Sequence, residues 1–280
     1  MRQVLGHPRK KALTQGMIFS AGAVSGYTGK EVYGLIITAR CDIAQNKVEA
    51  YHYVPVVSLK DWMEISGIAE ISERAIDNAK SSIRNIMKNN DFSPSAIESQ
   101  DPRFVMDRLF PEGSEDRNIR KTREKFLGYI EDIEKASSLS SLERASSLFP
   151  GVVSGLAAEV IKNKITGLYF IEKVDPLGED HGYVIMLRNV SRIPQSLGRA
   201  IEGGLDVNDY KEYIKSDVTV SGCLDFSAFD YCMPVSQISS PYIEHIMQAF
   251  SAVFSRIGVD DLSKSYIETL WGRQKVGGVK

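Results

Sequence analysis

Short apolar runs near the start of the chain predict β-strands. Residues 16–20 read Gly-Met-Ile-Phe-Ser, and residues 33–38 read Tyr-Gly-Leu-Ile-Ile-Thr, a continuous run typical of a strand buried on both faces. After a polar break over residues 42–47, residues 48–59 alternate and are rich in Val and Tyr, which predicts the next strand. Because Pro55 has no N–H to donate, we expect its end of this strand to form a sheet edge or a bulge.

The pattern changes to a helical spacing over residues 59–165. An apolar stripe that begins at Ala75 has Ser72 as its expected N-cap. Residues 114–136 open with Ser-Glu-Asp, which suits the positive end of a helix dipole, and then carry apolar residues along one stripe. Two shorter helices are expected within residues 137–164.

Strand patterns return after this helical segment. Residues 167–171 and 183–187 are apolar and are joined by turn-forming residues, which predicts a β-hairpin. A short helix is expected over residues 195–201. One or two further strands are expected within residues 215–231.

The last predicted element is an amphipathic helix. Ser240 is its expected N-cap and Pro241 its first helical residue, a position that proline favours. From Ile243 to Ile257 apolar residues recur at steps of three or one, and Gly258 suits the end of the helix. This wide apolar face is expected to pack on a core or on a partner.

Together these elements predict an α+β protein. We expect a small SH3-like β-barrel or sheet with a long helical insertion and a C-terminal amphipathic helix. Residues 1–62 would form the first β part, residues 63–165 the helical insertion, and residues 166–280 the second β part with the last helix. We find no internal repeat.

Composition places the chain among ordinary globular proteins. Its 280 residues are 43% hydrophobic and 25% charged, and the formal net charge is -2. This charge disfavours a globally basic nucleic-acid binder but leaves room for a local basic patch. No apolar stretch approaches the roughly 18 residues of a membrane-spanning helix, so no membrane partner is expected.

Cysteine usage indicates a reducing compartment. Cys41, Cys223 and Cys232 are odd in number and widely spaced, unlike a disulfide framework or a zinc site. The N-terminal residues lack the apolar segment of a signal peptide. A cytoplasmic location is therefore expected.

A candidate catalytic group lies where the buried strand ends. Arg40, Cys41 and Asp42 follow the strand, and His52 lies on the next one. An adjacent arginine favours a thiolate, His52 would act as its base, and Asp42 would orient the histidine, as in a cysteine hydrolase. In the alternative interpretation Cys41 is a small buried residue, and Arg40 and Asp42 only brace a turn.

Two further groups are candidates for binding. Cations cluster within nine residues and would attract a phosphate backbone, although downstream acids on the same helix favour a solvated face laced with salt bridges. The cluster consists of Arg117, Arg120, Lys121, Arg123 and Lys125. On the last helix, Glu244, His245 and Gln248 are candidates for partner binding, or else for a solvated edge.

Common catalytic and cofactor motifs are missing from the sequence. It contains no P-loop, nucleophile elbow, zinc-protease motif or dinucleotide-binding glycine motif. Only four histidines are present, which disfavours a multi-histidine metal site. We therefore expect no metal and no cofactor.

Three segments within residues 16–58 follow a known layout. They are Gly16-Met17-Ile18, the apolar run over residues 32–38, and Pro-Val-Val-Ser over residues 55–58. This layout resembles the opening of MazF/PemK-type toxin barrels, where an Arg before the second strand and a Thr after the Pro support RNA cleavage. The corresponding positions here are Val32 and Val57, which lack that chemistry.

The resemblance implies an enlarged, chemically silent relative of these barrels. We expect a non-catalytic binding component of a bacterial toxin–antitoxin or anti-phage system that engages a partner protein; RNA or DNA binding and a homodimer are further expectations. The alternative is an enzyme, either a barrel-type endoribonuclease using Arg40 and Ser58 or a cysteine hydrolase using Cys41 and His52. A binding role predicts that Cys41 is buried. Catalysis predicts that the strand-end residues share an open cleft.

Overall fold

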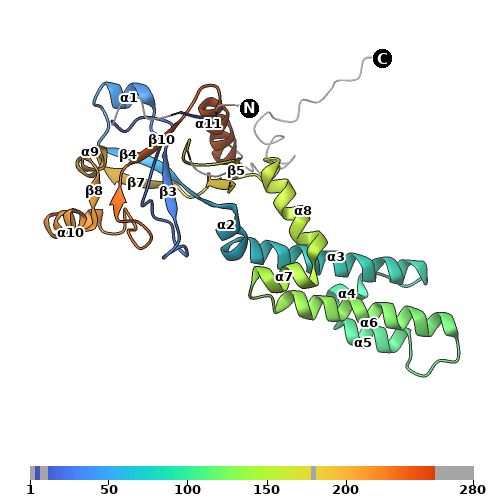
Figure 1. The fold of residues 1–280 in the computed structure, drawn as a ribbon. Helices are drawn as coiled ribbons and strands as arrows, with labels where there is room; N and C mark the ends of the chain where they lie inside the picture. Colours follow the sequence, from blue (N-terminus) through green and yellow to red (C-terminus); the bar gives the residue numbers. More distant parts are fainter. Residues whose placement is uncertain (1–3, 7–11, 178–180, 256–280) are drawn as a thin grey trace, which may run out of the picture.

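Strands from both sides of the helical segment meet in one sheet, from which a helical arm projects (Figure 1). This computed structural model describes residues 4–6, 12–177 and 181–255. It combines helices with an antiparallel sheet that is curled into a half-barrel. Across the described residues, every helix is too short or too polar to cross a bilayer.

Most strands have five residues or fewer, whereas β4 has nine. In chain order they are β1 Leu5–Gly6, β2 Met17–Phe19, β3 Val32–Ile36, β4 Ala50–Ser58, β5 Leu168–Ile171, β6 Tyr183–Met186, β7 Ser191–Pro194, β8 Leu205–Asp206, β9 Tyr231–Cys232 and β10 Pro234–Ile238. Strands β8 and β9 pair separately from the main sheet.

Helices fill the segment between β4 and β5 and also follow β3, β7, β8 and β10. They are α1 Arg40–Ala44, α2 Leu59–Ile65, α3 Gly67–Asn89, α4 Ala96–Ser99, α5 Pro102–Leu109, α6 Arg117–Ser137, α7 Leu142–Leu148, α8 Pro150–Ile161, α9 Gln195–Gly203, α10 Val207–Ser216 and α11 Tyr242–Phe254. A 3-10 turn, η1, covers Val218–Val220.

Strand β4 pairs with three strands of the main sheet. Among the described residues the sheet runs β1-β10-β2-β3-β4-β6-β5, and β7 also pairs with β4. The prediction that both β regions complete one sheet is confirmed by the pairing of β4 with β6. The edge or bulge expected at Pro55 is wrong, because Pro55 is buried opposite Gly34 of β3. On its other side, β4 pairs with β7 over residues 50–53 and with β6 over residues 56–58. Pro55 therefore lies where the neighbour of β4 changes from β7 to β6.

Both faces of the sheet are covered. On one face Ile36 and Tyr53 pack with residues of α9 and α10. On the other face Leu35 and Val54 pack with residues of α11. This double burial explains the unbroken apolar run in β3, as its sequence predicted.

The helical arm consists of α2 to α8. Helices α3 and α6 lie side by side and run away from the sheet (Figure 1). Near the sheet, Ser72 Oγ donates to the Ala136 carbonyl at 2.8 Å. Farther out, Met87 and Phe126 share a small apolar core with α5. The base of the arm packs on the sheet through Trp62 and neighbouring residues.

Several predicted boundaries are wrong. The polar break after β3 contains the short helix α1. Ser72 lies inside α3, which begins at Gly67. The strands expected within residues 215–231 are absent from the described structure except for β9; η1 and turns replace them, and α10 precedes them. Pro241, rather than Ser240, is the N-cap of α11, and Ile257 and Gly258 lie outside the described residues.

Candidate functional site

The strand-end group lies on α1 and the facing part of β4. Arg40, Cys41, Asp42 and His52 are all exposed, so the burial of Cys41 expected for a binding role is wrong. Cys41 Sγ lies 3.6 Å from Asp42 Oδ1. The backbone N–H of His52 donates to Thr38 Oγ1 at 2.6 Å. Within the described residues, no imidazole base lies within hydrogen-bonding distance of Cys41.

Ser58 lies at the opposite end of β4 from this group. It lies six positions after His52, which corresponds to about 20 Å of extended chain. Its hydroxyl caps α2: Oγ accepts from the Asp61 N–H at 3.0 Å and donates to Asp61 Oδ2 at 2.6 Å. Arg40 and Ser58 therefore do not share a site, and the endoribonuclease pair expected from sequence is not assembled.

The capped end of α2 holds a polar cluster that the sequence analysis missed. Lys30 Nζ, from the loop before β3, lies 2.6 Å from Asp61 Oδ1 and 3.3 Å from Glu64 Oε2. Tyr27 Oη from the same loop lies 2.8 Å from Ser66 Oγ. The Ser-Leu-Lys-Asp spacing at residues 58–61 is a capping signature that would have located the cluster. Its contacts fasten the loop to the base of the arm.

Asp61 makes this cluster sensitive to acid. Partial burial raises the pKa of its carboxyl, but hydrogen bonds from Lys30 and Ser58 outweigh this, and the pKa lies below its ordinary value. A lowered pKa adds stability above the unfolded pKa of about 3.9, and that stability is lost as the pH falls through the folded value.

Asp61→Asn is therefore expected to lower the free energy of unfolding by about 1 kcal/mol or less at neutral pH. The difference from wild type should begin to shrink below about pH 4 and be lost as the pH falls below the folded pKa of Asp61. Urea unfolding across a pH series measures it, with the exposed Asp77→Asn as control. An Asp61→Asn effect that persists unchanged at pH 3 would contradict this assignment.

Val32 and Val57 are the residues that the sequence resemblance matched with the catalytic Arg and Thr of the toxin barrels. They lie directly opposite each other on β3 and β4. Their exposed fractions are 1% and 0%, and they pack with Trp62 and Leu156 from the base of the arm. This location is therefore apolar and covered.

The three cysteine thiols differ in solvent exposure. Cys232 is buried, its Sγ donates to the Ser20 carbonyl at 2.9 Å, and burial raises the pKa of its thiol well above the ordinary value. Burial also raises the pKa of the half-buried Cys223. Cys41 is the exposed thiol. No group of three potential metal-ligating His, Cys, Asp or Glu residues occurs in the described part of the chain.

The basic cluster lies on α6, and its members divide into two kinds. Arg123 is a structural residue: Nη2 lies 2.6 Å from Asp107 Oδ1, and Nη1 donates to the Phe110 carbonyl at 2.6 Å. The other four, which we call the basic face, are exposed. They are Arg117, Arg120, Lys121 and Lys125.

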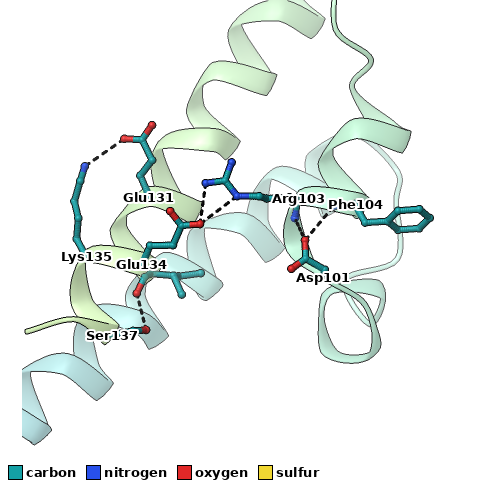
Figure 2. A network of polar contacts seen from close by, with 8 residues as sticks. Asp101, Arg103, Phe104, Glu131, Glu134, Lys135 and Ser137 are labelled. Atoms are coloured by element: carbon teal, nitrogen blue, oxygen red, sulfur yellow. Dashed lines mark hydrogen bonds and ion pairs between the residues drawn. The ribbon is translucent and has the colours of Figure 1, made fainter.

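Acidic residues farther along α6 do not neutralise the basic face. Glu134 accepts from Arg103 of α5 at 2.8 Å, and Glu131 accepts from Lys135 at 3.2 Å (Figure 2). Asp101 caps α5 beside them. The ion pairs expected from the sequence occur on this helix, but they lie in its second half.

The predicted partner-binding residues lie on the outer side of α11. Glu244 and Gln248 line a groove of about 610 Å³, with Ile243 and Met247 among its other residues. His245 is exposed but does not line this groove.

The apolar residues of α11 differ in burial. Ile246 is fully buried, whereas Phe254 is 55% exposed.

Comparison of the chain with protein-family models, curated proteins and solved structures finds no match.

Proposed function

We propose that the protein is a non-catalytic binding component that engages a partner protein in a bacterial toxin–antitoxin or anti-phage system of the cytoplasm. The half-barrel sheet would be an enlarged variant of the SH3-like toxin barrel. The observation that carries this proposal is the paired, buried Val32 and Val57. Apolar side chains supply neither a general acid or base nor a group that binds phosphate, so these two residues cannot support RNA cleavage.

The groove on α11 is the proposed partner surface. It combines polar groups, Glu244 and Gln248, with apolar ones such as Met247, a mixture common in protein interfaces. Affinity at such surfaces depends on a few well-packed residues. Charge reversal within the groove should therefore weaken the complex more than a change beside it.

Induced expression in a bacterial host tests the absence of catalysis. Wild type and an Arg40→Ala, Cys41→Ala, His52→Ala triple variant are expected to permit the same growth. Arrest by wild type but not by the triple variant would contradict the proposal.

Partner capture from the native host tests the groove. A Glu244→Lys, Gln248→Lys variant should retain the captured protein at least about tenfold less than wild type. His245→Ala, on the same helix but outside the groove, is the matched control and should retain it. Equal retention by all three proteins would exclude α11 as the partner surface.

A cysteine hydrolase remains the second candidate because Cys41 is exposed near Arg40. Arrest that is abolished by Cys41→Ala alone would favour it.

A further inference from the structure

The basic face of α6 is a charged surface that the proposed function does not use. Its four cations, from Arg117 to Lys125, are exposed on the helix of the projecting arm (Figure 1). Among the described residues, no ion pair engages any of them. At 100° per residue they fall within about 140° of the helix circumference, on the side away from buried Phe126.

Three of the acids near the basic face have other partners, and Glu112 and Glu115 lie just before the helix. Asp116 is the N-cap of α6 and accepts from the Asn118 N–H at 2.7 Å. Asp107 pairs with Arg123, and Glu134 pairs with Arg103. Within the span of the basic face, Glu124 is the one acid in the sequence. The face therefore keeps a net positive charge although the whole chain has a charge of -2.

The position of the cations also opposes a local preference of helices. Asp116 caps the positive end of α6, but the first turn itself contains no acid and instead holds Arg117 and Arg120. Cations there weaken a helix, whereas acids would strengthen it. A sequence that breaks a local stability rule in this way is expected where the residues serve binding.

We propose that the basic face binds the phosphate backbone of duplex DNA without sequence preference. From Arg117 to Lys125 the helix is about 12 Å long. One strand of a duplex presents a phosphate about every 3.4 Å, so three to four phosphates face four cations. Single strands are bound chiefly by stacking on aromatic rings, and the nearest ring in sequence, Phe126, is fully buried. This proposal is independent of partner binding at α11.

Titration of the full-length protein with a short DNA duplex at several salt concentrations tests the proposal. Four phosphate contacts predict a slope of log K against log salt of about -3.6, which is about a 150-fold loss of affinity between 50 and 200 mM. Arg117→Gln with Lys121→Gln should reduce the slope to about -1.8 and the loss to about 12-fold. Because these changes remove cations from the N-terminal turns, the Tm should equal or exceed that of wild type.

Lys162→Gln with Lys211→Gln is the matched control. Both residues are exposed, lie outside α6, and give the same change in net charge. This variant should keep the wild-type slope. Absence of duplex binding at low salt, an unchanged slope in the α6 variant, or tighter binding of an RNA duplex or a single strand would each overturn the proposal.

Discussion

Replacing Phe126 with alanine is expected to lower the free energy of unfolding by about 3–5 kcal/mol. The side chain is fully buried, and its ring centroid lies 6.0 Å from that of Phe110. Ile83 and Met87 of α3 belong to the same small core. This core joins α3, α5 and α6, so the truncated side chain leaves a cavity at the point where the three helices meet. Urea unfolding measures the loss.

Phe104→Ala is the matched control for this prediction. Phe104 lies on α5 of the same arm but is 55% exposed and points away from the polar contacts beside it (Figure 2). Its truncation should change the free energy of unfolding by no more than about 0.5 kcal/mol. Equal losses in the two variants would show that the arm does not depend on this core. The result also matters for the basic face, because its four cations keep their spacing only while α6 is packed as a helix.

Period and residue type predicted most of the regular elements. The unbroken apolar run of β3 indicated burial on both faces, and Leu35 and Ile36 do pack on opposite faces. The stripe of α6 was equally informative, because Phe126 and Ile130 are buried. Such patterns are informative because each helix or strand buries one face, and the apolar residues of that face recur at the spacing of the element.

Element boundaries depended on partners that local sequence does not contain. Ser72 has the side chain of an N-cap, but its hydroxyl is used by the Ala136 carbonyl of α6. Val218-Thr219-Val220 is rich in β-branched residues, yet Asp217 caps it as a 3-10 turn by accepting from the Thr219 N–H at 2.9 Å. In both cases a hydrogen bond outweighs intrinsic propensity.

The candidate site was harder to predict than the fold because it depends on register. Cys41 and His52 come from adjacent elements, and their proximity in sequence indicated a pair. The antiparallel pairing of β3 with β4 places His52 beside the end of β3 and Ser58 beside its start. Arg40 and Ser58 are therefore divided between the two ends of the hairpin. The strand pattern alone does not fix that register.

Gly34→Ala is expected to lower the free energy of unfolding by about 1–3 kcal/mol. A Cβ at this position would lie 2.2 Å from Phe19 Cζ and 2.9 Å from Tyr53 Cδ2. The two rings pack edge to face, with centroids 5.1 Å apart, over the glycine. Tyr53 has little freedom to move, because its hydroxyl donates to the Cys223 carbonyl at 2.9 Å and accepts from the Ala23 N–H at 3.1 Å.

The same substitution at Gly128 should have the opposite sign. Gly128 lies inside α6, and apart from its chain neighbours and the backbone of its own helix no heavy atom lies within 4 Å of an added Cβ. Alanine there removes the conformational cost of glycine in a helix and should raise the free energy of unfolding by about 0.5–1 kcal/mol. Urea unfolding of both variants separates the two effects. A stabilising Gly34→Ala would mean that the Phe19 and Tyr53 rings yield, and that this part of the sheet is not packed as the structure shows.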